Sequence, residues 1–342
     1  MPITNRWVLA ERPNGLPEPN AFAFESVEIP ETKDGELQIR VTHFSVDPGM
    51  RPSLTQASYA GALPIGAPVT SAAIGVVELS NDPKFEPGDL VNGAFGWQDR
   101  VVVSARRVVK LDRDFLAAPI TETAAIGVLG IPGLTGYFGI LELGQLTQGQ
   151  TALISSASGP VGATAGQLVR IHGGQAYGLV GSTAKKVWLT QEAGFDGAIN
   201  YRESTDLSAS IREMCPDGVD LYFDNVGGET LDAAIENMKP KGRIIVSGQL
   251  AEYNMDPPRG IRNTLAFITH RLRMEGFVVL DYARQFRKAQ QILADHIRSG
   301  DLIYREEIIE GIENAPEAFI GLFRGENFGR RIIAIGSDKN LG

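Results

Sequence analysis

Hydrophobic and polar positions follow two different rhythms along the chain. Up to about residue 120, short β-branched runs alternate with turns rich in glycine and proline. The clearest runs are LQIRVTHFSV (37–46), AAIGVVEL (72–79) and RVVVSARRVVKL (100–111). Short strands that are punctuated in this way are typical of an all-β barrel or sandwich. The first third of the sequence therefore predicts a β-rich domain.

From about residue 124, apolar strand-like segments alternate with helix-like segments. The predicted strands are TALISS (151–156), QAYGLV (175–180), GAINY (197–201), VDLYFDNV (219–226) and GRIIVSG (242–248). Strands that alternate with helices indicate repeated βαβ units. The pattern predicts an α/β domain with a doubly wound parallel sheet, covered by helices on both faces.

The last part of the chain returns to the first rhythm. A helix is predicted within residues 281–300, with Gly300 as its stop, and strand-like segments follow at 302–309 and 330–336. These strands resemble those of the first section. We therefore predict one β-rich domain built from residues 1–123 and 303–342, and one α/β domain over residues 124–302.

Composition and charge exclude some classes of binding partner. The chain has 342 residues and a formal net charge of −9, and such an acidic protein repels nucleic acid and anionic lipid surfaces. It contains a single cysteine, Cys215, and no apolar stretch of membrane-spanning length. We predict a soluble cytoplasmic protein that binds neither nucleic acid nor membrane.

The sequence offers no set of metal ligands. Its four histidines, His43, His172, His270 and His296, are widely separated, and no Cys-x-x-Cys or His-x-x-x-His spacing occurs. Cys215 precedes a proline and has no histidine close to it in sequence, which argues against a catalytic thiol. We therefore expect no metal.

The strongest chemical motif is the segment SASGPVGATAG (156–166), which follows an apolar strand and opens a helix. Ala157, Gly159 and Gly162 have the spacing of a dinucleotide-binding fingerprint with alanine in the first position. Small residues let the backbone approach a pyrophosphate at the helix N-terminus, and Gly166 would let the helix pack closely. The alternative is a glycine turn with a purely structural role.

The end of the next strand indicates which dinucleotide is preferred. NAD sites place an acidic residue there to bind the ribose hydroxyls. This chain has Gly181-Ser182-Thr183-Ala184-Lys185-Lys186, and no carboxylate precedes Glu192. Hydroxyl and ammonium groups suit a 2′-phosphate, so the segment favours NADPH. The alternative is that Lys185 and Lys186 form only a solvated helical turn.

Several sequence blocks carry a family resemblance. They are RWVLAERP (6–13), DPGMR (47–51), GWQD (96–99), GIPGLTGYFGI (130–140), SASGPVGATAGQL (156–168), YFDNVGGETLD (222–232), SGQLAEYN (247–254), EGFVV (275–279) and GENFGRRI (325–332). Together they resemble the zinc-independent medium-chain reductases of the prostaglandin and alkenal reductase group, including bacterial NADPH-dependent curcumin reductases. The resemblance covers essentially the whole chain. It implies a GroES-like β-rich domain, a Rossmann domain and a homodimer in which residues 275–280 extend the sheet.

The resemblance also implies roles for individual residues. The pyrophosphate would lie on Gly159, Pro160, Val161 and Gly162, and the 2′-phosphate beside Lys185 and Tyr201, with Lys186 as the alternative lysine. The residues expected around the nicotinamide half are Asn225, Ser247, Gly248, Phe277, Val278, Val279 and Asn327.

Two positions depart from the family pattern. Gly49 stands where the family usually has tyrosine, and the loss of that ring would widen the substrate cleft. Ser247 stands where related enzymes often have cysteine, and nothing in the sequence explains that change.

We expect hydride transfer from NADPH to the β-carbon of an α,β-unsaturated ketone or aldehyde, a small hydrophobic enone. An enone delocalises the incoming charge onto its oxygen, so hydrogen-bond donors can replace a Lewis-acid metal. Tyr253, which matches the family's substrate-side tyrosine, is the candidate for binding the enolate or delivering the proton, and a packed aromatic is its alternative. Tyr59 is the second candidate, while Pro48 and Met50 would line an apolar slot or belong to the core.

Two other functions remain open at this stage. A quinone oxidoreductase would share the fold and the NADPH preference. A nucleotide-binding protein without catalysis would bind NADPH and show no turnover.

Overall fold

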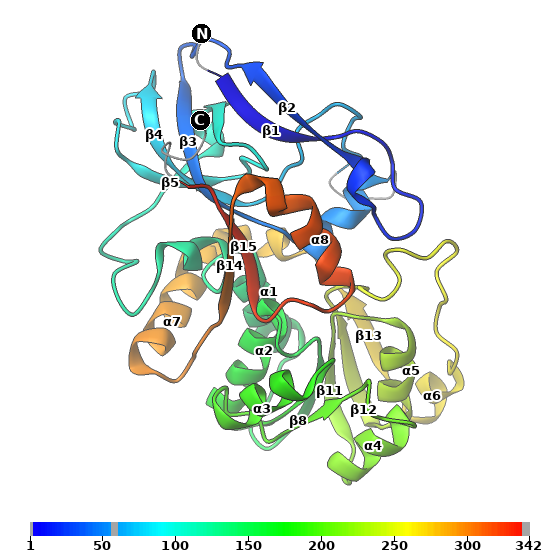
Figure 1. Cartoon of the computed structure of the whole chain (residues 1–342). Helices are drawn as coiled ribbons and strands as arrows, with labels where there is room; N and C mark the ends of the chain where they lie inside the picture. The colour runs from blue at the N-terminus through cyan, green and yellow to red at the C-terminus, as the bar shows by residue number, and fades with distance from the viewer. Residues whose placement is uncertain (1–2, 56–60, 337–342) are drawn as a thin grey trace. The chain divides into compact units, whose positions relative to one another are not determined.

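Figure 1 shows the computed structural model of the chain, which describes residues 3–55 and 61–336. The chain forms two compact units, one from Met1–Ile126 with Glu306–Gly342 and the other from Gly127–Arg305. We refer to them as the terminal unit and the central unit. The sequence had suggested borders at 123/124 and 302/303. None of the helices among the described residues is both long enough and apolar enough to span a bilayer.

The central unit is built on a six-stranded sheet in which every neighbouring pair is parallel. Its strands are β8 (Thr151–Ser155), β9 (Gln175–Val180), β10 (Gly197–Asn200), β11 (Val219–Asp224), β12 (Met238–Val246) and β13 (Arg273–Gly276). Their order is β10-β9-β8-β11-β12-β13. This is the doubly wound order of a Rossmann fold, with its switch point between β8 and β11. The predicted α/β class is confirmed.

Helices follow the strands in the central unit, as Figure 1 shows. They are α1 (Ile131–Phe138), α2 (Pro160–Ile171), α3 (Thr183–Gln191), α4 (Leu207–Met214), α5 (Gly228–Glu236), α6 (Leu265–Thr269) and α7 (Phe286–Ser299). Helix α2 packs on β8 and β9, and α3 packs on β9 and β10. The predicted stop of α7 is confirmed, because Gly300 caps it with a φ of 82°.

The terminal unit is β-rich, as predicted. The strands β1 (Ile3–Leu9) and β2 (Phe22–Glu28) form an antiparallel pair. A second sheet has the order β14-β15-β3-β4-β5-β7, and β6 pairs with β3. The bounds are β3 (Glu36–Ser45), β4 (Ala73–Ser80), β5 (Leu90–Gly93), β6 (Arg100–Ser104), β7 (Val109–Lys110), β14 (Glu306–Glu310) and β15 (Arg330–Ala334), and the helix α8 (Ala315–Phe323) lies between the last two strands.

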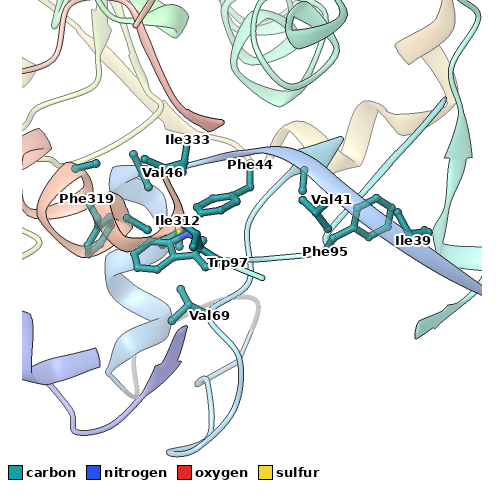
Figure 2. Close-up of a cluster of buried hydrophobic side chains, with 14 of the residues drawn as sticks. Ile39, Val41, Phe44, Val46, Val69, Phe95, Trp97, Ile312, Phe319 and Ile333 are labelled. Carbon is teal, nitrogen blue, oxygen red and sulfur yellow. The ribbon is translucent and has the colours of Figure 1, made fainter. Parts of the chain in front are cut away.

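The core of the terminal unit explains why both chain ends belong to one domain. Figure 2 shows the indole of Trp97 among side chains from distant parts of the sequence. The Trp97 ring centroid lies 5.3 Å from that of Phe22 and 5.9 Å from that of Phe319 on α8. In the sheet, Ile333 of β15 is paired with Phe44 of β3. Burial of these large apolar groups therefore joins the last segment of the chain to the first.

Two predicted strands differ from the structure. The run 100–111 is interrupted by a 3-10 turn at Ala105–Arg107, because β6 pairs with β3 whereas β7 pairs with β5, and the chain must turn between these partners. The run 275–280 is a strand only as far as Gly276. Its partner β12 ends at Val246, which is paired with Gly276, so no further ladder partner is available on that side.

Candidate functional site

The candidate site of the central unit lies at the carboxyl edge of its sheet. The strand order brings the ends of β8, β11 and β12 side by side, and α2 begins at the same edge. Ligands of doubly wound sheets bind at this edge, beside the switch point between the two halves of the sheet. The residues predicted to hold a dinucleotide follow these strand ends.

The turn after β8 presents a free helix start. Ser156 has a left-handed φ of 49°, and the Gly159 amide donates to the Ser156 carbonyl at 3.0 Å. Gly159 is the N-cap of α2, Pro160 occupies the first turn, and Val161 follows. No side chain caps this end, and the first turn carries no acidic residue. The positive end of the helix dipole therefore remains available to a diphosphate.

Two glycines of this motif are required by close packing. A Cβ on Gly162 would lie 2.5 Å from the Ser156 carbonyl oxygen and 2.8 Å from the Ala157 Cα. A Cβ on Gly166 would lie 1.9 Å from the ring of Phe195. Any side chain at either position would push the helix away from its turn or its neighbour. The close packing that the sequence predicts at Gly166 is therefore a contact with the ring of Phe195.

The end of β9 gathers hydroxyl and cationic groups. A Cβ on Gly181 would lie 2.9 Å from the Tyr201 hydroxyl and 3.5 Å from Arg202 Nε, so both side chains face this turn. Lys185 lies in the first turn of α3 and is buried, while its amide donates to the Ser182 hydroxyl at 3.4 Å. Lys185 and Tyr201 thus both lie beside this turn.

The structure adds two residues to the turn after β9 that the sequence analysis did not include. They are Arg202 and Glu203, and the Glu203 carboxylate accepts a hydrogen bond from the Thr183 hydroxyl at 2.7 Å. Lys186, the alternative lysine, is exposed. The parallel pairing of β10 with β9 brings the residues after β10 next to the turn after β9. That neighbouring strand was the signal that could have identified both residues.

Asn225 links the ends of three strands. Its backbone amide donates to the Ser155 hydroxyl at 2.8 Å, and its side chain donates to the Ser155 carbonyl at 2.7 Å. Its carbonyl accepts from the amide of Leu250 at 3.2 Å. The amides of Ser247 and Gly248 both donate to the carbonyl of Asp224. The loops after β8, β11 and β12 are therefore fixed to one another.

A buried carboxyl supports this junction. Asp224 accepts hydrogen bonds from the amides of Val226 and Gly227 and from the Tyr222 hydroxyl, at 2.9 to 3.1 Å. Burial raises the pKa of Asp224 above its usual value, while these donors oppose the increase. The carboxyl thus holds the start of α5 in place beneath the junction.

Tyr253 lies beside this junction. A Cβ on Gly248 would lie 3.3 Å from the Tyr253 hydroxyl and 3.2 Å from the Asn225 carbonyl oxygen. The amide of Tyr253 donates to the Gln249 carbonyl at 3.1 Å, which sets the direction of this loop. The glycine therefore leaves room for the phenol next to the ends of β11 and β12.

The segment after β13 completes the apolar part of this edge. Phe277 and Val278 are half-buried and Val279 is buried. The ring of Phe277 is 3.1 Å from the place where a Cβ on Gly139 would stand. Gly139 in turn lies against Phe223 of β11, so this segment belongs to the same part of the central unit.

The terminal unit contains the remaining predicted residues. Pro48 begins a 3-10 helix over Pro48–Leu54, and Met50 in the same helix is 9% exposed and belongs to the hydrophobic core. A Cβ on Gly49 would meet nothing within 4 Å. Asn327 donates from its side chain to the Gly329 carbonyl at 3.1 Å. Tyr59 lies outside the described residues.

Histidine, cysteine and acidic side chains are the groups that could hold a metal ion or act as a nucleophile. Across residues 3–55 and 61–336, no group of three or more His, Cys, Asp or Glu side chains is arranged to hold a metal ion. Cys215 is buried, and burial raises the pKa of its thiol to about 12. A thiol with such a pKa carries almost no thiolate at neutral pH.

Comparison with known proteins places this arrangement in a family. Residues 5–111 match a family model described as the N-terminal domain of oxidoreductase, and residues 160–295 match one described as zinc-binding dehydrogenase. A 2-alkenal reductase (NADP(+)-dependent) from Nicotiana tabacum is 36% identical over 342 residues, covering 97% of this chain and 98% of the relative. The NADPH-dependent curcumin reductase of Escherichia coli is 36% identical over 340 residues, with 97% of each chain covered.

A solved structure is similar to this chain over nearly its whole length. The crystal structure of CurA in complex with NADPH from Vibrio vulnificus has a TM-score of 0.91 and 32% identity, covering 97% of this chain and 99% of that one. The fold and these similarities place the chain among the medium-chain dehydrogenases/reductases. Within this family, the chain belongs to the group of NADP-dependent oxidoreductases that includes the alkenal and curcumin reductases. The resemblance inferred from the sequence blocks is confirmed.

Proposed function

We propose that this protein uses NADPH to reduce the carbon–carbon double bond of α,β-unsaturated ketones or aldehydes. The observation that carries the proposal is the meeting of three groups at one sheet edge: the uncapped start of α2, the junction at Asn225, and the phenol of Tyr253. Similarity over nearly the whole chain to an alkenal reductase and a curcumin reductase supports this chemistry.

The residues present fit a phosphorylated dinucleotide. The tight approach of Gly162 to Ser156 keeps side chains away from the first turn of α2, where Gly159, Pro160 and Val161 would face the pyrophosphate. Lys185, Tyr201 and Arg202 around Gly181 would hold the 2′-phosphate through charge-assisted hydrogen bonds. Lys186 is the weaker candidate, because its side chain is exposed.

The nicotinamide half would lie along the remaining strand ends. Asn225, Ser247 and Gly248 form the junction, and Phe277, Val278 and Val279 supply the apolar segment after β13. Asn327 of the terminal unit is assigned to this half by the family resemblance. When bound, NADPH supplies a hydride to the substrate.

Tyr253 carries the polar part of the reaction in this proposal. Hydride addition at the β-carbon moves the π electrons of the double bond toward the carbonyl and leaves negative charge on its oxygen. The Tyr253 hydroxyl donates a hydrogen bond to that oxygen or transfers its proton to the α-carbon, and water restores the phenol. One double bond is thereby reduced, with a hydride and a proton added across it.

The family resemblance assigns the apolar substrate contacts to Pro48 and Met50. Pro48 begins the 3-10 helix that carries Gly49, and the open space next to Gly49 favours a bulky substrate. Met50 supports this helix from the core. Tyr59 remains a candidate contact from the sequence alone.

We also propose a cytoplasmic homodimer. The single cysteine suits a reducing compartment. The strand β13 is the last strand of the central sheet, so its outer edge is available for pairing with a second copy. Sedimentation equilibrium at micromolar concentration measures this directly, and a monomer mass would contradict the proposal.

Product analysis tests the proposed reaction. We expect NADPH that is deuterated at the transferable position to place its label on the β-carbon of a 2-alkenal, giving the saturated aldehyde. Label on the carbonyl carbon, giving an unsaturated alcohol, would contradict double-bond reduction. Parallel turnover with a benzoquinone separates the quinone oxidoreductase alternative, and NADPH binding without any turnover would indicate the non-catalytic one.

A further inference from the structure

A pocket lined mostly by cationic residues lies at the amino edge of the central sheet, opposite the candidate site. It has a volume of about 470 Å³ and is lined by Gln145, Lys241, Arg243, Arg271 and Arg273. Four of these five residues are cationic and none is acidic, although the whole chain has a formal net charge of −9. Such a pocket is large enough for a small ligand. We call it the cationic pocket.

The sheet itself forces two of the cations together. Arg243 of β12 and Arg273 of β13 are directly paired in the parallel register. Like charges at directly opposed positions of neighbouring strands repel each other. Arg271 and Lys241 each precede one of these arginines by two residues and line the same pocket. Repulsion within this group is a cost that a bound anion would remove.

The hydrogen-bond acceptors of Arg243 are uncharged. Arg243 donates to the Gln150 side-chain oxygen at 2.7 Å and to the Gln145 carbonyl at 3.4 Å, both uncharged acceptors. Its Nε is buried and has no hydrogen-bond partner among the described residues. Burial lowers the pKa of the Arg243 guanidinium, Asp220 opposes this effect, and Arg273 lowers the pKa further. Asp220 itself forms an ion pair with Lys239 at 2.8 Å.

Three residues that line the cationic pocket have an unusual backbone conformation. Gln145, Lys241 and Arg271 have positive φ angles of 43°, 68° and 53°. Within residues 3–55 and 61–336, the only other non-glycine residue of this kind is Ser156, in the turn before α2. Unfavourable conformations persist where the surrounding structure enforces them, and they cluster at binding sites. Three residues with positive φ angles thus line one pocket.

The cationic pocket is separate from the candidate cofactor site. Arg243 and Arg273 lie toward the amino ends of β12 and β13, whereas Ser247 and Phe277 follow the carboxyl ends of the same strands. The strands are parallel, so the two sites occupy opposite edges of one sheet. A ligand in the cationic pocket therefore does not compete for the turn before α2.

We propose that the cationic pocket binds a small phosphate anion that carries at least two negative charges, such as a diphosphate group. Guanidinium groups match phosphate oxygens with paired hydrogen bonds, which distinguishes this ligand from a simple halide. The ammonium of Lys241 adds a further donor. This inference does not depend on the proposed reaction of the carboxyl edge.

Calorimetric titration with inorganic pyrophosphate tests the proposal. The full chain is titrated at constant ionic strength, with and without saturating NADPH. When NADPH occupies the turn before α2, we expect one site per chain, and the variants are compared in this state. In Arg243→Gln/Arg273→Gln, the affinity should fall at least tenfold. In the matched control Arg284→Gln/Arg287→Gln, which removes two exposed arginines elsewhere in the central unit, it should change less than twofold.

Each other result would overturn the assignment. Equal losses in both double variants would indicate attraction by general charge, and complete competition by NADPH would place pyrophosphate in the cofactor site. The absence of binding to the wild-type chain would also exclude the pocket. If the first double variant does not fold, Arg273→Gln alone on the edge strand should weaken pyrophosphate at least threefold, and an unchanged affinity would contradict the proposal.

A second arm identifies the source of the phosphate. ADP and pyrophosphate carry the same diphosphate chemistry, so in the presence of saturating NADPH both should bind and both should raise the melting temperature of the wild-type chain. Tighter binding of ADP would show that the nucleoside contributes, whereas equal binding would restrict recognition to the phosphates. Either result requires the loss in Arg243→Gln/Arg273→Gln, and ADP binding that survives this substitution would contradict the site.

Discussion

The two edges of the central sheet present positive charge by different means. At the carboxyl edge, the first turn of α2 presents uncapped backbone amides, and Gly162 and Gly166 keep side chains out. At the amino edge, the long side chains of Arg243, Arg273 and Lys241 surround the pocket. The first arrangement fixes geometry through the main chain, and the second concentrates charge through side chains.

This difference predicts how each edge responds to substitution. Backbone sites tolerate no added volume, because the atoms that would have to move belong to helices and strands. Side-chain sites tolerate changes of volume but depend on charge.

The largest effect is expected at Tyr253. Tyr253→Phe removes the hydroxyl but keeps the ring, and we expect kcat with a 2-alkenal to fall about 100-fold, a typical contribution of a positioned proton donor. The Kd for NADPH should stay unchanged. The matched control is Arg273→Gln at the amino edge, which should retain wild-type turnover.

Steady-state kinetics and fluorescence titration of NADPH provide these measurements. Unchanged turnover in Tyr253→Phe would show that the phenol is only a packed aromatic. If kcat fell equally in Tyr253→Phe and Arg273→Gln, the reaction would not depend on the carboxyl edge alone, and the proposed difference between the two edges would be wrong.

Added volume at Gly162 should produce the next effect. In Gly162→Ala the new methyl group would stand 2.5 Å from the Ser156 carbonyl oxygen. We expect a loss of about 1–3 kcal/mol in the free energy of unfolding, the usual range for overpacking, and weaker NADPH binding. Urea denaturation and NADPH titration measure both quantities.

Gly49→Ala is the matched control for this substitution. It adds the same methyl group where nothing lies within 4 Å, at a position without positive φ. Its stability and NADPH affinity should equal those of the wild-type chain. Identical behaviour of the two variants would contradict the close packing at α2.

Charge removal at the turn after β9 should have a smaller, selective effect. Lys185→Gln should raise the KM for NADPH about tenfold, the loss expected for one charge-assisted hydrogen bond, and leave the KM for NADH unchanged. Lys186→Gln, at the exposed neighbour, should change neither value. A larger effect at Lys186 than at Lys185 would reverse our assignment of the phosphate contact.

The smallest effect is expected at Cys215, which is buried at the end of α4 and is influenced by the charge of Lys239. Because its pKa is about 12, the native thiol should resist iodoacetamide at pH 8 and react fully in denaturant. Cys215→Ala should keep wild-type turnover. Rapid labelling of the folded chain, followed by mass spectrometry, would contradict the buried position.

The same thiol gives a pH dependence of stability. The folded chain holds the proton of Cys215 more tightly than the unfolded chain, whose thiol has a pKa near 9. This contribution is fully present below pH 9 and is lost as the pH rises toward 12. In Cys215→Ala, the loss of stability over that range should be smaller.

The sequence predicted the elements that depend on local pattern. The strand, turn and helix around Gly159 and Gly162 are visible in it because small residues follow an apolar run directly. The merging of both chain ends into one domain was visible for the same reason, since strand-like runs return after residue 302. Fold class and cofactor follow from such short-range signals.

Contacts between distant segments could not be predicted in the same way. Arg202 reaches the turn after β9 because β10 is paired with β9, and the pairing of Arg243 with Arg273 depends on the register of β12 and β13. Gln145, Lys241 and Arg271 are ordinary polar residues in the sequence, and only the backbone reveals their positive φ. Strand order and register therefore decide the parts of both sites that pattern alone leaves open.

The cationic pocket also has a consequence for the speed of binding. The formal net charge of −9 surrounds a local group of positive charges, so an approaching anion meets repulsion at long range and attraction at short range. The screening distance is about 30 Å in 0.01 M salt and about 8 Å in 0.15 M salt. Moderate salt would screen the distant repulsion first, so the association rate of pyrophosphate should rise with salt before it falls.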